Sequence, residues 1–139
     1  MVPEASDQTL ASVVIPNWNG KQHLSVCLDA LLAQTHPCVQ IILVDNGSTD
    51  GSQAFVEDRY PWVQLLALGD NYGLTGGSNA GFRAAEGEIL ISLNTDTEAT
   101  PTFVAELVAA MEEQPRAGMV AAKMLLFDKP EVIHSAGDG

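Results

Sequence analysis

The stretch Ile41–Gly51 reads IILVDNGSTDG and decides the fold of this chain. Its four apolar residues stop abruptly at Asp45, and turn-forming residues follow. A short run rich in Val and Ile and closed by a turn predicts a buried strand, here over 39–44. Such a strand suits the middle of a parallel sheet. Asp45 is therefore expected at the carboxyl end of that strand, where open α/β sheets bind ligands, although it could simply begin a turn.

Outward from this stretch, apolar runs of strand length alternate with helical patterns. Helices are expected because leucines and other apolar residues recur at helical spacing and because Thr100-Pro101 is typical of a helix start. Strands alternating with helices predict an α/β fold, a three-layer α/β/α sandwich around a mostly parallel, doubly wound sheet. The predicted strands are 11–15, 39–44, 62–68, 88–93 and 119–127, and the predicted helices are 21–33, 51–58, 78–85 and 101–113.

The same pattern of strands and helices indicates the boundaries of the domain. The 139 residues suffice for one domain with a real core. Residues 1–10 read as a loose arm, and residues 128–139 show no strong element. Because no closing helix follows the last predicted strand, we expect the chain to be the amino-terminal part of a longer protein, with the tail leading to a missing half.

Composition narrows the class of ligand. Six basic and 18 acidic side chains give a net charge of −12, which disfavours nucleic acids and anionic lipid. A ligand that carries phosphates must therefore be held by backbone N–H groups or by a divalent metal. No run approaches the roughly 18 apolar residues of a membrane span, and the first residues do not resemble a signal peptide. Two cysteines without a motif favour the reducing cytoplasm.

Polar residues cluster where three of the predicted strands end: Pro16–Asn19, Asp45–Ser48 and Asn94–Asp96. In a parallel sheet these ends share one edge, so their convergence favours a binding site. The carboxylates of Asp45 and Asp96 could accept hydrogen bonds from a base or ribose, or bind Mg²⁺ or Mn²⁺. The alternative is that Asn94–Asp96 is only a turn leading into the next helix.

The loop Gly73–Gly81 reads GLTGGSNAG. Glycines before a helix N-terminus are typical of phosphate-binding turns, but the residues match neither a P-loop nor the dinucleotide fingerprint. A flexible surface loop is the alternative. Asn79 falls on the first turn of the helix that is expected to follow. Trp18 could stack on a base or sugar, or simply pack.

Together, VVIPNWNG, ILVDNGSTDGS, NYGLTGGSNAGF and AEGEILISLNTDT resemble family 2 glycosyltransferases of the GT-A fold, in particular the rhamnosyltransferase-like group of bacterial surface polysaccharide synthesis. The likeness runs from about residue 12 to 137. It implies an inverting transfer of sugar from a UDP- or dTDP-linked donor to a glycan or lipid-linked acceptor. It implies donor contacts from Pro16, Asn17, Asn19, Asp45, Gly77, Asn79, Asn94 and Thr95, with Asp45 on the pyrimidine. Asp96, with Asn94, would hold Mn²⁺ or Mg²⁺.

Two positions depart from the family pattern. Asn94 stands where the D-x-D motif begins with an acid, and Ser78-Asn79 stands where many members carry Arg-Asn. The family's general base lies beyond the end of this chain, so no catalytic residue is assigned within it. We therefore expect donor binding with little or no sugar transfer. We also expect a cytoplasmic protein, with a peripheral position at the membrane as an alternative for the full-length form, and self-association through apolar surface at Met119–Phe127.

Two other classes of protein stay open on the sequence. One is a nucleotide-dependent enzyme of another class on a doubly wound sheet, such as a dehydrogenase, which the missing glycine fingerprint disfavours. The other is a noncatalytic module whose acidic surface binds a protein partner. The fold alone cannot choose, because sheets of this type host many functions.

Overall fold

A four-stranded parallel sheet forms the centre of the molecule in the computed structural model, which describes residues 9–113, 124–125 and 133–135. The strand order is β3-β2-β1-β4, with every neighbouring pair parallel. Because the chain moves from β1 outward to β3 and then returns to the far side of β1, the winding reverses between β1 and β4. Ligands of open α/β sheets bind at such a switch point. The strands are β1 Ala11–Asn17, β2 Val39–Asp45, β3 Gln64–Ala67 and β4 Ile89–Ser92.

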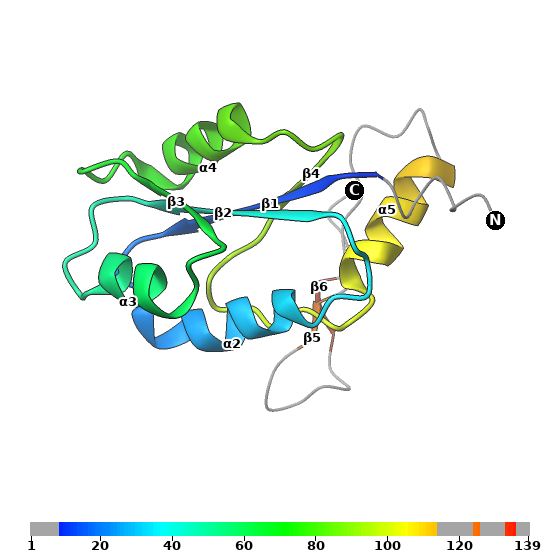
Figure 1. Ribbon diagram of the computed structural model, residues 1–139, viewed down its shortest axis with the longest axis horizontal. Helices are drawn as coiled ribbons and strands as arrows, with labels where there is room; N and C mark the ends of the chain where they lie inside the picture. Colours follow the sequence, from blue (N-terminus) through cyan, green and yellow to red (C-terminus); the bar gives the residue numbers. More distant parts are fainter. Residues whose placement is uncertain (1–8, 114–123, 126–132, 136–139) are drawn as a thin grey trace.

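Helices cover both faces of the sheet, which confirms the predicted three-layer α/β/α arrangement (Figure 1). Side chains of α2, α3 and α5 share one apolar cluster with alternate residues of β1 and β2, among them Val13 and Leu43. The residues between these, such as Val14 and Val44, point to the other face and pack against α4. The helices are α2 Lys21–Leu32, α3 Ser52–Arg59, α4 Gly73–Ala84 and α5 Phe103–Glu113.

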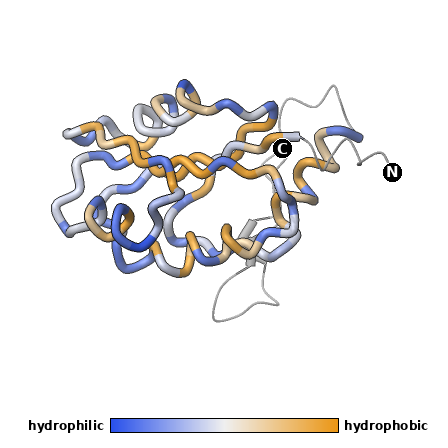
Figure 2. Tube along the Cα trace, viewed as in Figure 1, coloured by the Kyte–Doolittle hydropathy of each residue, from blue (hydrophilic) through white to orange (hydrophobic). Residues whose placement is uncertain are grey.

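The central strands are apolar along nearly their whole length, as the tube coloured by hydropathy shows (Figure 2). Residues Ala11 to Ile15 of β1 and Ile42 to Val44 of β2 have almost no exposed surface. Burial on both faces is what the continuous apolar runs of the sequence predict for inner strands.

Pro16 does not end the first strand, contrary to expectation, but lies inside β1 opposite Val44. Alternate residues of β1 bond to opposite neighbours, since the Val14 carbonyl accepts from Leu93 of the β4 side and the Asn17 carbonyl accepts from Asn46 of the β2 side. The nitrogen of Pro16 therefore faces the β4 side, beyond the last paired residue, Val14. A residue without an N–H is tolerated there because no partner strand needs the donor.

Helix α4 begins at Gly73, five residues before the predicted start, so the whole of the expected loop Gly73–Gly81 is helical. The reason is tertiary packing. A Cβ on Gly81 would lie 2.3 Å from Val14 Cγ1 and 2.9 Å from Val44 Cγ2, and Gly77 is equally close to Asn46. These glycines let α4 approach the sheet, and the helix tolerates their low propensity because it gains this contact.

One aspartate holds the starts of two helices. The Asp50 carboxylate accepts a 3.0 Å hydrogen bond from the backbone N–H of Lys21, at the beginning of α2, and another from the N–H of Ser52, at the beginning of α3. Asp50 lies one residue before Gly51, the N-cap of α3, so its carboxylate reaches the first N–H groups of both helices. Since the capped ends lie beside β1 and β2, the same residue fixes the backbone around the carboxyl edge of the sheet.

Of the strand expected at 119–127, the structure describes residues 124–125, and these form a strand. Within the described residues, β5 Met124–Leu125 pairs antiparallel with β6 Ile133–Ser135 in a separate two-stranded sheet. The tail expected to lack strong elements thus contributes a strand. The rest of the run at 119–127, expected to be a strand or an extended segment, lies outside the described residues. The surface proposed for self-association lies largely outside the described residues.

Candidate functional site

The carboxyl ends of β1 and β2 meet at Asn17 and Asp45, which are direct register partners. Asp45 has no exposed surface. Its Oδ1 accepts a 2.9 Å hydrogen bond from Asn17 Nδ2, and its Oδ2 accepts from the Ser48 N–H at 2.9 Å and from Gln53 Nε2 at 2.7 Å. Both carboxylate oxygens therefore accept hydrogen bonds from the protein, and the expected contact of Asp45 with a pyrimidine stays a prediction.

The electrostatics of Asp45 agree with this structural role. Burial acts most strongly and raises the pKa of the carboxyl. The hydrogen bonds from Gln53, Ser48 and Asn17 together outweigh it and hold the pKa below the ordinary value of 3.8. Donors that converge on a carboxylate favour its charged form. Asp45 is thus a fixed anion that ties β1, the following turn and α3 to one another.

The turn at residues 17–20 is ordered by the same network. Ser48 Oγ accepts from the Asn19 N–H at 2.8 Å, and Asn19 Oδ1 accepts from the Thr49 N–H at 2.8 Å. Asn19 has a φ of 52°, in the left-handed region that asparagine tolerates better than most residues. Asn17 and Asn19, both predicted to touch a donor, thus bond to the 45–49 turn in this structure.

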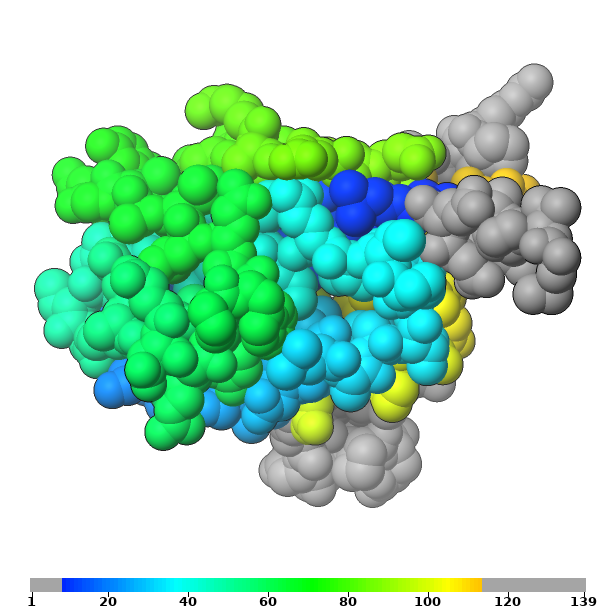
Figure 3. Space-filling view, viewed as in Figure 1, coloured from blue at the N-terminus to red at the C-terminus, as the bar shows by residue number. Residues whose placement is uncertain are grey.

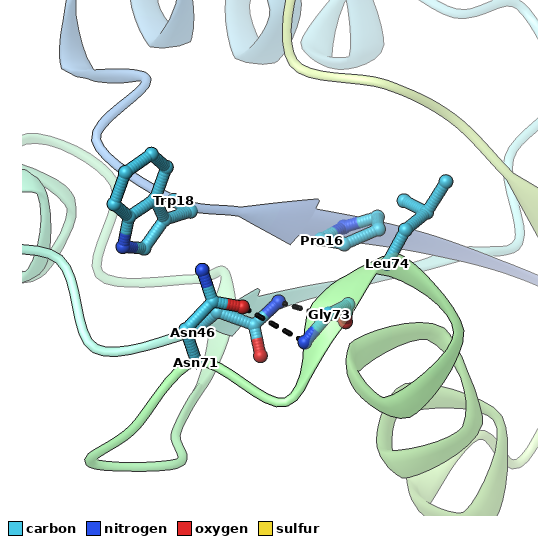
Figure 4. A pocket seen from close by; sticks show the side chains of 6 residues that line it. All are labelled: Pro16, Trp18, Asn46, Asn71, Gly73 and Leu74. Carbon is cyan, nitrogen blue, oxygen red and sulfur yellow. Dashed lines mark hydrogen bonds between the residues drawn. The ribbon is translucent and has the colours of Figure 1, made fainter.

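A pocket opens on the α4 side of the strand ends (Figure 4). Side chains alternate along a strand, so the residues beside Asn17 and Asp45 face the opposite way. Pro16, Trp18 and Asn46 accordingly line this pocket, together with Asn71, Gly73 and Leu74. Figure 4 shows Trp18 and Leu74 at opposite ends of the pocket, with Asn46 and Gly73 between them. Pro16 is the one predicted donor contact in this set.

Asn46 forms the polar wall of the pocket. Its Nδ2 donates to the Gly73 carbonyl, and its Oδ1 accepts from the Tyr72 N–H, both at 3.4 Å. These bonds are long, so the amide keeps much of its capacity to bond to a ligand. Asn46 belongs to the polar cluster 45–48 expected after the strand, but the sequence analysis gives it no role of its own. Extending the period-two alternation of Ile42 and Val44 by one step would have found it.

The segment that leads into α4 forms the outer wall. Asn71 Oδ1 accepts a 2.8 Å hydrogen bond from the Gly73 N–H, which fixes the turn, and Gly73 has a φ of 78° that favours glycine. Figure 3 shows that the chain from α3 to α4, coloured green, covers the end of the molecule at which β1 and β2 finish.

Two predicted contacts, Gly77 and Asn79, lie elsewhere on α4. Gly77 is buried, and a Cβ there would lie 2.6 Å from Asn46 Nδ2. Its role in this structure is close packing behind the pocket wall, so the backbone there does not form an open phosphate cradle. Asn79 is exposed on the helix surface.

The turn after β4 lies on the other side of the strand ends. Thr95 and Asp96 line a second hollow with His23, Val26 and Thr97, between the turn and α2. Asn94 is exposed, and its carbonyl accepts from Thr97 Oγ1 at 2.6 Å. The strand-end clusters predicted to converge do so, but they face two separate hollows.

Cys27 of α2 packs under this turn, with Sγ 3.9 Å from the Asn94 carbonyl oxygen. Burial raises the pKa of its thiol to about 11, with a smaller contribution from the charge of Asp96, while a hydrogen bond with Thr97 acts the other way. The thiol is therefore neutral at physiological pH and serves as a small apolar contact rather than as a nucleophile.

The residues of the second hollow fit a divalent metal only in part. Among the described residues, no group of three or more His, Cys, Asp or Glu side chains could hold an ion. Asp96 supplies one exposed carboxylate. Mg²⁺ is commonly bound by one or two carboxylates together with water and substrate phosphates. The chain thus fits a metal that is shared with a diphosphate, not one that the protein binds by itself.

The family model for glycosyl transferase family 2 matches residues 12–136, nearly the whole chain. The chain belongs to this family. The match confirms the resemblance read from the motifs, and it leaves a dehydrogenase without support.

Curated relatives of this glycosyltransferase chain agree. An uncharacterized glycosyltransferase of Nostoc, alr2836, is 33% identical over 78% of the chain and 35% of that protein. An undecaprenyl-phosphate 4-deoxy-4-formamido-L-arabinose transferase of Proteus mirabilis is 35% identical over 73% of the chain and 33% of that protein. The chain therefore spans about a third of the length of the relatives it matches.

Solved structures share the fold. TarS of S. aureus superposes with a TM-score of 0.70 at 21% identity, over 84% of the chain and 39% of the TarS chain. A mannosyltransferase of Pyrobaculum calidifontis, solved with GDP-Man and Mn²⁺, gives a TM-score of 0.65 at 21% identity, over 85% of the chain and 35% of that protein. These neighbours confirm the predicted glycosyltransferase fold.

Proposed function

We propose that this chain is the donor-binding part of a glycosyltransferase and binds a nucleotide-diphospho-sugar. The observation that carries the proposal is the pocket between Pro16, Trp18 and Asn46, at the carboxyl edge where the winding of the sheet reverses. It combines an apolar wall, an indole that is 58% exposed and an amide with spare hydrogen-bonding capacity. An aromatic face and an amide together suit a nucleobase, which has an apolar face and a polar edge.

Within this proposal the base is read by Asn46 and not by Asp45. The amide can accept the N3–H of uracil or thymine with Oδ1 and donate to a neighbouring carbonyl with Nδ2. Asp45 instead holds the strand ends in place through its bonds to Asn17, Ser48 and Gln53. Trp18 stacks on the base, and Pro16 closes the inner wall. Both UDP- and dTDP-linked donors fit this chemistry.

The diphosphate is placed at the second hollow, beside Thr95 and Asp96. The three basic side chains in the stretch 9–113 are Lys21, Arg59 and Arg83, and none of them lines either hollow. A diphosphate needs compensating charge, and a Mn²⁺ or Mg²⁺ ion shared with Asp96, with Asn94 beside it, supplies that charge and stabilises the leaving group when bound. Asp96 then serves to orient the diphosphate over the edge of the sheet. The mannosyltransferase neighbour with Mn²⁺ supports this part of the proposal.

The remaining steps belong to the longer protein. We propose an inverting attack by an acceptor hydroxyl, activated by a base outside this chain, in surface polysaccharide or cell-envelope synthesis. The relative named for undecaprenyl phosphate supports a lipid-linked acceptor. Membership of the rhamnosyltransferase-like group, a cytoplasmic site at the membrane and self-association stay predictions. None of the described helices is long and apolar enough to cross a membrane.

Calorimetric titration with UDP and with dTDP, each with and without Mn²⁺, tests the proposal. We expect one of the nucleotides to bind, with affinity increased by Mn²⁺, and we expect Asn46→Ala to weaken binding in both conditions. Arg83→Ala, an exposed change on α4 outside both hollows, is the matched control and should bind as the wild type does.

The outcomes separate the proposed function from the remaining alternative. Lack of binding by either nucleotide, in a chain shown to be folded by circular dichroism, contradicts donor binding and favours the noncatalytic module. Sugar transfer to an acceptor at a rate typical of a complete transferase, roughly 1 s⁻¹ or more, contradicts the assignment of the base to the missing half.

A further inference from the structure

A buried carbonyl oxygen without a hydrogen-bond partner lies at the strand ends. Asn17 is 1% exposed, and its Oδ1 is the one buried side-chain polar atom of the described residues that no donor reaches. The amide cannot simply be turned round, because Nδ2 donates to Asp45 Oδ1 and to Ser48 Oγ. Rotation would place the oxygen of Asn17 against the carboxylate of Asp45. An orphaned buried acceptor is costly and calls for an explanation.

Gly20 keeps a space open beside this oxygen. A Cβ on Gly20 would lie 2.6 Å from Asn17 Oδ1 and 3.0 Å from Thr95 Oγ1. The backbone of Gly20 has a φ of −103° and a ψ of 22°, which other residues also adopt. Glycine is therefore required here for room and not for conformation. The room that it leaves lies between an acceptor without a donor and a hydroxyl that can donate.

The turn that carries Thr95 has little main-chain support from β1. Pairing of β1 with β4 ends at Val14 opposite Ser92, and the last bond between them runs from the Leu93 N–H to the Val14 carbonyl at 3.0 Å. Beyond it, the turn is closed by its own bond from Thr97 to Asn94. No strand ladder opposes a small shift of Thr95 toward Asn17.

We infer that Thr95 is a positioning residue, whose hydroxyl donates to Asn17 Oδ1 when the turn closes over a bound diphosphate. The inference rests on the proposed function, since Asp96 is the carboxylate that we place beside the metal and the diphosphate. With this bond made, Asp96 is fixed relative to Asn17 and Asp45. The pocket for the base and the hollow beside Asp96 are then held in a fixed relative position. Binding of the nucleotide therefore strengthens binding of the metal, and binding of the metal strengthens binding of the nucleotide.

Variants of Thr95 test the bond, because the turn is half-buried and the changes are small. Thr95→Val keeps the shape and removes the hydroxyl, and Thr95→Ser keeps the hydroxyl. With Mn²⁺ present, we expect Thr95→Val to bind the preferred nucleotide about tenfold more weakly, as the loss of one hydrogen bond predicts. Thr95→Ser should stay within about threefold of the wild type. Gly20→Ala, whose methyl group separates the two oxygens, should behave like Thr95→Val.

A second readout follows the acceptor itself. The side-chain amide signals of Asn17, in nuclear magnetic resonance spectra, should move when UDP or dTDP is added with Mn²⁺ to the wild type and to Thr95→Ser. They should move less in Thr95→Val. The unfolding midpoints of the free wild type and Thr95→Val should agree, because the bond is absent from the free structure.

Each outcome decides the inference. Equal affinity of the wild type and Thr95→Val overturns it and leaves donor binding intact. Weaker binding with unchanged movement of the Asn17 signals also overturns it, because Thr95 then contacts the donor directly. A lower unfolding midpoint for the free Thr95→Val protein assigns Thr95 a structural role instead. If the wild type binds no nucleotide, the proposed function fails, and the role of Thr95 fails with it.

Discussion

Asn17 and Asp45 end neighbouring parallel strands as register partners, and the Asn17 amide donates to the Asp45 carboxylate at 2.9 Å. This contact shows which residues at the strand ends face α2 and α3 and which face α4, because side chains alternate along a strand. Residues in step with the pair, facing α2 and α3, form a closed network of hydrogen bonds. Residues out of step with it, Pro16, Trp18 and Asn46, line an open pocket. The pair itself is therefore expected to matter for stability, and its neighbours for binding.

Replacement of Asp45 by asparagine tests the structural half of this division. The amide cannot accept on both sides as the carboxylate does, so the donors Ser48 N–H and Gln53 Nε2 lose a charged acceptor. Hydrogen bonds to a charged group are worth about 1.5–3 kcal/mol, and we expect the free energy of unfolding to fall by about 2–3 kcal/mol. Urea denaturation measures this change.

Asp58→Asn is the matched control for that experiment. The Asp58 side chain is 84% exposed on α3 and lies outside the network. We expect a change within about 0.5 kcal/mol. A similar small effect at Asp45 would contradict the role that we give to its carboxylate.

The contribution of Asp45 to stability should decrease at acid pH. Its pKa in the folded chain lies below the ordinary value of 3.8. The stabilisation is therefore complete above the pKa of the unfolded chain and is lost as the pH falls through the lower pKa of the folded chain. Urea midpoints measured from about pH 6 down to about pH 2 should converge for wild type and Asp45→Asn. A difference that persists unchanged at the acid end would argue against this linkage.

Trp18 should affect binding without affecting folding. Its indole is 58% exposed at the mouth of the pocket, so truncation removes little buried surface. Stacking of a base on an aromatic side chain is worth about 1–3 kcal/mol, and we expect Trp18→Ala to weaken nucleotide binding about tenfold or more. Calorimetry with the preferred nucleotide measures the loss, and thermal unfolding checks the fold.

Trp62 provides the control for Trp18. It is 45% exposed and packs edge-on against Tyr60, outside both hollows. Trp62→Ala should leave nucleotide affinity unchanged. If both tryptophan variants bind as the wild type does, the indole of Trp18 does not stack on the base.

The metal is expected to bind together with the nucleotide and not before it. Asp96 is one carboxylate, and the described residues supply no cluster of three ligands. We expect no saturable binding of Mn²⁺ alone below about 1 mM, and clear enhancement of nucleotide binding by the ion. Asp96→Asn should remove the enhancement, while Glu98→Gln, an exposed neighbour, should keep it. Tight binding of Mn²⁺ by the free chain would show that other ligands exist.

Close packing of α4 makes a further prediction about stability. A Cβ at Gly81 would lie 2.3 Å from Val14 Cγ1, so Gly81→Ala forces the helix away from the sheet. Although alanine favours helices, overpacking costs about 1–3 kcal/mol, and we expect a net loss. Thr75→Ala, exposed on the same helix, should be neutral or slightly stabilising. An increase in stability for Gly81→Ala would show that the helix can move at no cost.

Much of the fold could be predicted because the positions of strands and helices follow from local patterns of apolar and turn-forming residues. The run at Ile41–Val44 closed by Asp45 marks an inner strand, and helical spacing marks α2 and α5. The start of α4 was not predicted because Gly73, Gly76 and Gly77 have low helix propensity, and the reason for glycine at 77 is its close packing against Asn46. The sequence predicts polar clusters at the carboxyl ends of the strands, and Asn17 and Asp45 lie there, but it does not by itself show that Asn46 faces the pocket. Which side chains face the pocket depends on the alternation of side chains along β2, and this alternation continues to Asn46, one residue beyond the strand.

Pro16 lies in the part of β1 that no longer pairs with β4. Beyond Val14, no main-chain hydrogen bond joins β1 to the β4 side within the described residues. Asn17 and Asp45 lie on the β1–β2 side of this division, and the segment from Asn71 to Leu74 forms a wall of the pocket beside them. That wall contacts the end of β2, because the Tyr72 N–H donates to Asn46 Oδ1 and Asn46 Nδ2 donates to the Gly73 carbonyl, both at 3.4 Å. A graft of residues 69–76 from a related chain would therefore change the hydrogen-bond partners of Asn46, and with them the base that the pocket accepts.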